Sequence, residues 1–215
     1  MNELFERIQK TGIVPVIKID DAKDILPLSE ALLKGGIDIA EITFRTDAAA
    51  EAITLVKREF PKMLVGAGTV LSTENADKAQ AAGAEFIVTP GFNPKIVDYC
   101  ISKNIPIIPG CSIPSEIEFA LERGLEVVKF FPAEESGGLA KIKAMSAPYS
   151  GVRFMPTGGI SLENLGKYAA FPKIIACGGS FMVKDTLIKN GKWDEITELS
   201  KKAVDCIREA RAKSI

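Results

Sequence analysis

Short apolar runs rich in valine and isoleucine alternate with longer amphipathic stretches along the chain. Eight of these runs have the length and composition of buried strands, and they span 13–18, 37–43, 63–68, 85–90, 105–110, 125–131, 152–157 and 173–178. Helical patterns are predicted after them, at 22–35, 47–60, 73–82, 94–103, 114–123, 137–147, 161–170 and 194–212, with a short helix before the first strand. Many of these helices begin at a capping residue or end at a glycine.

This alternation predicts one domain, residues 1–215, built around a parallel sheet. Continuous apolar strands separated by helices are typical of sheets covered on both faces, and eight such units form a closed (β/α)₈ TIM barrel. The alternative is a doubly wound open sheet, which binds a nucleotide at a glycine-rich turn after its first strand. The residues that follow the first apolar run, IKIDD, contain no such turn. A barrel is therefore the predicted fold.

The composition narrows the possible partners. The chain has 27 basic and 28 acidic side chains, so a polyanion-binding surface is not expected, and nucleic acid is an improbable partner. Its four cysteines, which are far apart in the sequence and include no C-x-x-C pair, fit a reducing cytoplasm. The first residues lack the basic start and apolar core of a signal peptide, and no apolar run reaches membrane-spanning length.

Histidine is absent from the chain. The commonest general base and the commonest zinc ligand are therefore missing, so acid and base chemistry falls to carboxylates, lysine or tyrosine. No acidic cluster in the sequence indicates a magnesium site, and no metal is predicted.

One lysine, Lys129, lies within the apolar run VVKFFP. A charged amine is costly to bury unless it is paired, and a desolvated amine loses its proton more readily and becomes a nucleophile. Two interpretations follow. The side chain either reaches solvent or a carboxylate for structural reasons, or it reacts with a substrate.

Polar residues follow the ends of the other predicted strands, where barrel enzymes carry their chemistry. In IDIAEITFR, strand alternation puts Glu41, Thr43 and Arg45 on one face, which we expect to point into the barrel and its mouth. Glu41 is predicted to form a buried ion pair with Lys129 or to transfer protons. Arg45 suits a carboxylate or phosphate, although an arginine at a rim is commonly just solvated.

The last two strands end in PTGGIS and CGGSF, and each places paired glycines before a helix. Glycines allow backbone amides to approach an anion, and barrels commonly hold phosphate after strands seven and eight. Each pair alone is typical of a tight turn, but the two together predict a phosphate site. An interior lysine and glutamate beside such a site predict Schiff-base chemistry on a phosphorylated keto acid.

The sequence resembles the class I 2-keto-3-deoxy-6-phosphogluconate (KDPG) aldolase and 4-hydroxy-2-oxoglutarate aldolase family. The resemblance runs through GIVPVI, EITFRT, GAGTV, TPGFNP, KFFPAE, PTGGIS and GGS. It implies a homotrimeric barrel without a cofactor that reversibly cleaves KDPG to pyruvate and glyceraldehyde 3-phosphate, a reaction of the Entner–Doudoroff pathway.

The resemblance also implies roles for individual residues. Lys129 would form the imine, and Glu41 would move protons, with a water between it and the substrate. Arg45 and Thr69 would hold the substrate carboxylate. The residues implied to hold the phosphate are Gly158, Gly159, Gly179 and Ser180, and further substrate contacts are implied for Pro90, Phe131 and Thr157.

Several alternatives stay open at this point. The galactonate-epimer aldolases share the fold and the lysine, but they tend to have valine where this chain has Thr157, which favours gluconate. Cleavage of 4-hydroxy-2-oxoglutarate is a possible side activity. Lys18 is unexpected after PVI, and it either tunes the carboxylate end or is solvated by Asp20 and Asp21. A phosphosugar isomerase or decarboxylase on the same barrel, or a sensor that binds phosphate without turnover, would use the glycines without an imine.

Overall fold

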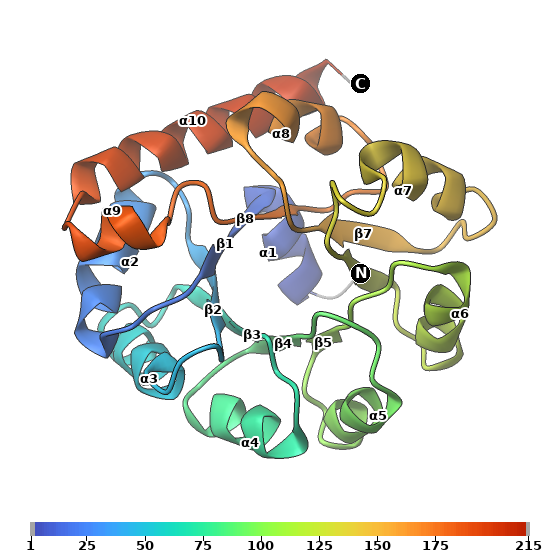
Figure 1. The fold of residues 1–215 in the computed structure, drawn as a ribbon, viewed down its shortest axis with the longest axis horizontal. Helices are drawn as coiled ribbons and strands as arrows, with labels where there is room; N and C mark the ends of the chain where they lie inside the picture. The colour runs from blue at the N-terminus through green and yellow to red at the C-terminus, as the bar shows by residue number, and fades with distance from the viewer. Residues whose placement is uncertain (1–2, 214–215) are drawn as a thin grey trace.

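A computed structural model describes residues 3–213, and these form a ring of parallel strands surrounded by helices (Figure 1). Within this range there are eight strands. They are β1 Ile13–Ile17, β2 Ile39–Thr43, β3 Leu64–Gly68, β4 Phe86–Val88, β5 Ile107–Ile108, β6 Val127–Phe130, β7 Arg153–Pro156 and β8 Cys177–Gly179. The first and last residues of the predicted domain, 1 and 215, lie outside the described residues.

Backbone pairing closes the ring. Six strands form one parallel sheet in the order β5-β4-β3-β2-β1-β8, and β6 pairs with β7. Isolated bridges join the two groups, from Gly110 to Lys129 on one side and from Thr157 to Gly178 on the other. The amide of Cys111 donates to the carbonyl of Lys129 at 2.7 Å across the first seam. The predicted TIM barrel is confirmed.

All but one of the helices follow strands and make up the outer circle seen in Figure 1; the exception, α1, precedes β1 and lies across the middle of the ring in this view. Ten α-helices are described within residues 3–213. They are α1 Glu3–Thr11, α2 Ile25–Lys34, α3 Ala49–Glu59, α4 Thr73–Ala81, α5 Pro94–Ser102, α6 Pro114–Glu122, α7 Gly138–Ser146, α8 Leu162–Ala169, α9 Asp185–Lys189 and α10 Trp193–Ala212. Capping fixes several starts, because Ser72 Oγ accepts from the Asn75 amide and Asn93 Oδ1 accepts from the Lys95 amide. Among residues 3–213, no helix is both long and apolar enough to cross a membrane.

Most strands are shorter than predicted, and β5 keeps only Ile107–Ile108 of the predicted 105–110. Three further differences concern where elements begin or whether they were predicted. The stretch 22–35 begins with a short 3₁₀ turn, Ala22–Asp24, before α2. The eighth strand begins at Cys177 rather than at 173, since Ile174 makes a single bridge to Phe154 and the glycine-rich end pairs with β1. The five-residue helix α9 was not predicted, because it is too short to show a helical period.

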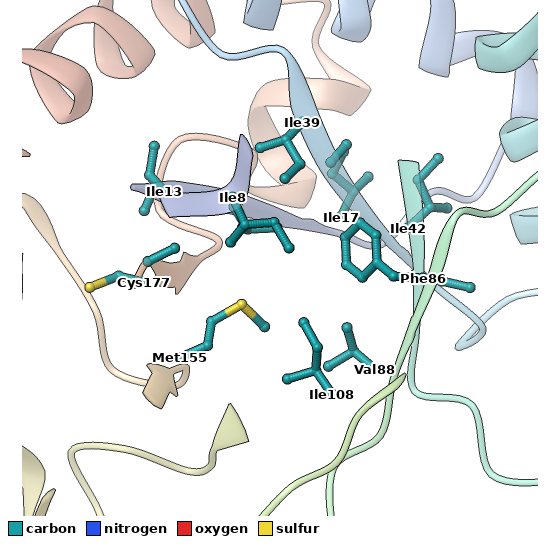
Figure 2. Close-up of a cluster of buried hydrophobic side chains, with 14 of the residues drawn as sticks. Ile8, Ile13, Ile17, Ile39, Ile42, Phe86, Val88, Ile108, Met155 and Cys177 are labelled. Atoms are coloured by element: carbon teal, nitrogen blue, oxygen red, sulfur yellow. The ribbon is translucent and has the colours of Figure 1, made fainter. Parts of the chain in front are cut away.

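The amino-terminal helix α1 covers one end of the barrel. Its buried residue Ile8 belongs to a cluster that includes Ile13, Ile39 and Cys177, which begin three of the strands (Figure 2). Arg7 strengthens this cover, because its guanidinium donates to the Lys62 carbonyl at 2.8 Å, just before β3. The carboxyl ends of the strands, at the other end of the barrel, are left for a site.

Candidate active site

A cavity of about 340 Å³ opens at the carboxyl ends of the strands. Residues from most of the strands and the loops after them line it, so closing the barrel is what brings them together. The lining residues are Val16, Glu41, Thr43, Arg45, Thr69, Pro90, Lys129, Phe131, Thr157, Gly158, Gly159, Ile160, Gly178 and Ser180.

Lys129 and Glu41 meet inside this cavity. Lys129 is 5% exposed and Glu41 is 0% exposed, and the Lys129 Nζ lies 3.3 Å from Glu41 Oε1. The amine also lies 5.3 Å from the centre of the Phe131 ring. Strand β6 supplies the lysine and β2 the glutamate, 88 residues apart in the sequence. The amine is therefore shielded from water, held beside one proton-accepting group and open to the cavity.

Strand β3 leaves room for the glutamate. Its residues pair with β2 so that Gly66 lies opposite Glu41 and Gly68 opposite Thr43. A Cβ on Gly68 would overlap the Glu41 carboxylate, with its Cγ at 2.7 Å and its Cδ at 2.8 Å. Gly68 of GAGTV thus has a steric reason, because a side chain at this position would occupy the space of the carboxylate.

Two buried oxygen atoms of the cavity have no hydrogen-bond partner within residues 3–213. They are Glu41 Oε2 and Thr157 Oγ1. An unpaired buried polar atom costs about 1–3 kcal/mol, and buried polar groups nearly always have a partner. Both oxygens belong to lining residues of the same cavity. A water or a ligand hydroxyl in the cavity would satisfy them, which indicates a site built for a polar ligand.

The Arg45 and Thr69 side chains lie at the rim of the cavity, on neighbouring strand ends. Arg45 Nε donates to Thr43 Oγ1 at 3.0 Å, which fixes the stem of the guanidinium. Thr69 has a φ of 55°, in the left-handed region that branched side chains rarely adopt. Strain of this kind is typical of functional positions, where the surrounding structure holds it.

The two glycine pairs lie in different environments. Gly158 and Gly159 have φ values of 98° and 72°, which only glycine adopts easily, and both line the cavity. Gly178 also lines it, and a Cβ there would overlap the Thr157 hydroxyl. Gly179 is not among the lining residues, because the alternation of β8 turns its Cα toward Phe181 and Ile13.

A family model described as "KDPG and KHG aldolase" matches residues 4–199. The chain belongs to the KDPG and KHG aldolase family.

Relatives and solved structures of this family cover nearly the whole chain. The 2-dehydro-3-deoxy-phosphogluconate aldolase of Haemophilus influenzae is 50% identical over 206 residues, covering 96% of this chain and 97% of that protein. The enzyme of the same name from Treponema pallidum is 48% identical, covering 96% of this chain and 99% of that protein. A KDPG aldolase structure from Legionella pneumophila, with pyruvate captured as a covalent carbinolamine, superimposes with a TM-score of 0.90 at 38% identity. The alignment covers 94% of this chain and 98% of that one.

Ten of the eleven residues predicted for the site of this aldolase family member line the one cavity, and Gly179 is the exception. Their individual roles stay predictions. Val16, Thr43, Ile160 and Gly178 also line the cavity and were not among these eleven residues, although Thr43 was expected on the same strand face as Glu41. Val16 has no local signal in the sequence, because its place beside Glu41 follows from the pairing of β1 with β2. Within residues 3–213, no group of three or more Cys, Asp or Glu side chains is arranged as a metal site.

Proposed function

We propose that this chain is a class I aldolase that reversibly cleaves KDPG to pyruvate and glyceraldehyde 3-phosphate through a Schiff base on Lys129. The observation that carries this proposal is the buried amine of Lys129, paired with Glu41 and facing the cavity. The names of the relatives and the covalently captured pyruvate in the Legionella enzyme support it.

The residues suffice for a balanced reaction. The ammonium of Lys129 passes a proton to Glu41, and the resulting neutral amine attacks the C2 ketone to give a carbinolamine. Glu41 returns this proton to the carbinolamine hydroxyl, which leaves as water, and an iminium ion remains. Glu41 takes the proton of the C4 hydroxyl, directly or through one water, and the C3–C4 bond pair moves into the iminium to give an enamine. Glyceraldehyde 3-phosphate leaves. Glu41 then returns a proton to C3, and hydrolysis of the iminium ion releases pyruvate and restores the ammonium of Lys129.

Glu41 is well placed for both proton transfers. Its Oε1 faces the amine and its Oε2 has no partner among the described residues, so one oxygen is free for a water or the substrate hydroxyl. The alternative role of Lys129 and Glu41 as a purely structural ion pair does not explain why both reach the same cavity.

Substrate binding divides between the two sides of the mouth. Arg45 and Thr69 would bind the carboxylate, because a planar guanidinium and a hydroxyl both donate to carboxylate oxygens. Gly158, Gly159 and Ser180 would bind the phosphate through backbone amides and the serine hydroxyl. Gly179 does not line the cavity, but it lies between the lining residues Gly178 and Ser180, so only its backbone amide is proposed as a contact. Pro90 and Phe131 would contact the carbon chain between the carboxylate and the phosphate.

The hydroxyl of Thr157 favours the gluconate substrate over the galactonate epimer. It is buried, lines the cavity and has no partner among residues 3–213, so it can bond a hydroxyl of the substrate. Cleavage of 4-hydroxy-2-oxoglutarate to pyruvate and glyoxylate needs the same lysine and carboxylate site but no phosphate. We propose it as a second, weaker activity.

The wider setting is also proposed. A KDPG-cleaving enzyme fits the Entner–Doudoroff pathway, and four unbridged cysteines fit a reducing cytoplasm. A homotrimer is proposed because the family resemblance implies one. Large apolar side chains exposed on α5, on α6 and just before α6 offer surface for a subunit contact, namely Ile101, Ile113, Phe119 and Leu121. Sedimentation should give a mass three times the 23.1 kDa of one chain.

The deciding experiment traps the imine. The protein is incubated with pyruvate and borohydride, digested, and mapped by mass spectrometry, with Lys129→Met as the control. We expect a pyruvyl adduct on Lys129 and none on the variant. An unmodified wild-type protein would sink the aldolase proposal and leave an isomerase, a decarboxylase or a phosphate sensor.

A further inference from the structure

The Gly158–Gly159 loop packs against residues that have no role in the proposed chemistry. The segment KFFPAE runs along this loop, and the amide of Glu134 donates to the Gly158 carbonyl at 3.2 Å. The amide of Ala133 donates in the same way to the Thr157 carbonyl at 2.8 Å. A Cβ on Gly159 would lie 2.6 Å from the Glu134 Cβ. The stem of Glu134 therefore packs directly against the loop.

Helix α8 holds both segments from outside. Asn164 Nδ2 donates to the Gly159 carbonyl at 2.9 Å, while its Oδ1 accepts from the Ser161 amide at 2.9 Å. Tyr168 lies one helical turn further on, so the two side chains share a face of α8. The Tyr168 hydroxyl donates to Glu134 Oε1. Helix α8 thus forms hydrogen bonds both with the glycine loop and with Glu134, which packs against that loop.

The Tyr168 hydroxyl is a dependable donor. Tyr168 is 1% exposed, and burial together with the bond to Glu134 raises the pKa of its phenol well above the ordinary value. Helix α7, the neighbour of α8 in Figure 1, supports the same point. Its first residue, Gly138, donates its amide to the Ala133 carbonyl at 2.8 Å. Contacts from two helices therefore converge on residues 133 and 134.

We propose that Tyr168 and Asn164 are positioning residues for the substrate phosphate. Tyr168 acts through Glu134 and Asn164 acts directly, and together they keep Gly158 and Gly159 in the left-handed conformation that lines the cavity. This inference rests on the proposed function, in which this loop binds phosphate. None of these contacts involves Lys129 or Glu41. Changes to them should therefore affect phosphate binding and leave the chemistry at Lys129 intact.

The test compares two matched tyrosines. Tyr168→Phe removes the hydroxyl that bonds Glu134, and Tyr149→Phe removes a hydroxyl that donates to Glu118 at 2.8 Å, away from the loop. For Tyr168→Phe we expect KM for KDPG to rise at least fivefold while kcat and the rate of pyruvate trapping by borohydride stay within twofold. Tyr149→Phe should change none of these. An unchanged KM in Tyr168→Phe, or a trapping rate that falls as much as kcat/KM, would overturn the proposal.

Variants of Glu134 supply a second measurement, useful even if Tyr168→Phe folds poorly. Glu134→Gln retains an oxygen that can accept from Tyr168, so KM should stay near that of the wild type. Glu134→Ala should raise KM as Tyr168→Phe does, and the double variant should be no worse than either single one. Additive effects, or a KM that Glu134→Ala leaves unchanged, would contradict the proposal. A wild-type protein that fails to trap pyruvate would instead defeat the proposed function itself.

Discussion

Unused hydrogen-bonding capacity and backbone strain occur together at the cavity. Glu41 Oε2 and Thr157 Oγ1 lack partners within residues 3–213, and Thr69 holds a left-handed backbone at the same cavity. Each feature costs free energy of folding, on the order of 1–3 kcal/mol. The folded protein is therefore less stable than it would be without these features. Bound substrate would recover part of the cost by giving hydrogen-bond partners to the two oxygens.

The strain at Thr69 makes a substitution informative. Thr69→Gly removes both the strained side chain and the hydroxyl proposed to bind the carboxylate. We expect the free energy of unfolding in urea to hold or rise slightly, because glycine adopts the same φ without strain. KM for KDPG should rise about tenfold, since a hydrogen bond to a charged group is worth about 1.5–3 kcal/mol.

Asn104→Gly is the matched control for Thr69→Gly, because Asn104 has a φ of 56° and does not line the cavity. Its KM should equal that of the wild type. A Thr69→Gly enzyme that loses stability but binds substrate normally would show that the threonine serves folding alone.

Gly68 offers a test of the room kept for Glu41. In Gly68→Ala the new methyl group would overlap the Glu41 carboxylate, which must then move away from Lys129. We expect kcat to fall at least a hundredfold, because general acid–base catalysis contributes about 10²–10⁴ and depends on this geometry. Gly151→Ala is the control, since a Cβ there has no neighbour within 4 Å. Equal kcat values for the two variants would rule out this role of Gly68.

Strand periodicity predicted correctly which side chains share a face of a strand. It could not predict the register between neighbouring strands. The alternation in IDIAEITFR brings Glu41, Thr43 and Arg45 to one cavity, as predicted. The need for glycine at position 68 depends on the register of β3 against β2, which only the folded sheet provides. The start of the eighth strand was misplaced because the glycines of CGG have low β-propensity while the residues before them have high propensity.

The short helix α9 is anchored by the buried side chain of Ile188 and carries a charge network at its start. Lys18 Nζ, just after β1, lies 2.8 Å from Asp20 and 3.1 Å from Asp185 at the start of α9. Lys189 also contacts Asp20 at 2.8 Å. Asp20 was an expected partner of Lys18 and Asp185 was not, because a contact across 167 residues has no local signal. Asp21 instead accepts from the Lys23 amide.

This network sets the titration of Asp20. Hydrogen bonds from Lys18 and then Lys189 lower the pKa of Asp20 to about 2. Because the pKa of Asp20 is lower in the folded protein than in the unfolded chain, its ion pairs stabilise the fold fully above the unfolded pKa, near 4. This stabilisation is lost as the pH falls through the folded pKa of about 2. In Lys18→Met we expect the pKa of Asp20 to rise toward the ordinary value without reaching it, since Lys189 remains. Carboxyl chemical shifts in a pH titration measure this. Lys23→Met is the control, and an unmoved pKa in Lys18→Met would contradict the network.

The whole barrel separates its stabilising end from its reactive end. Helix α1 covers the amino ends of the strands with apolar contacts, among them those of Ile8 with its neighbours in Figure 2. The cavity with Lys129 and Glu41 opens at the carboxyl ends. The overall architecture could be predicted because eight βα units leave few ways to bury their apolar faces. The position of α1 over the amino ends of the strands could not be predicted, because the pattern of an amphipathic nine-residue helix does not show which surface the helix covers.

This separation predicts that stability and catalysis can be changed independently. Ile8→Ala should lower the free energy of unfolding by about 3 kcal/mol, since Ile8 is 0% exposed and truncation of a buried isoleucine leaves a cavity. The cavity left by Ile8→Ala lies at the amino ends of the strands, and we expect the paired strands to hold the active site at their carboxyl ends unchanged. At temperatures well below unfolding, kcat and KM for KDPG should therefore match those of the wild type. Urea denaturation gives the first quantity and steady-state kinetics the second. A loss of stability accompanied by a matching loss of kcat/KM at low temperature would mean that α1 also supports the geometry of Lys129 and Glu41, and the two ends would then have to be treated as one cooperative unit.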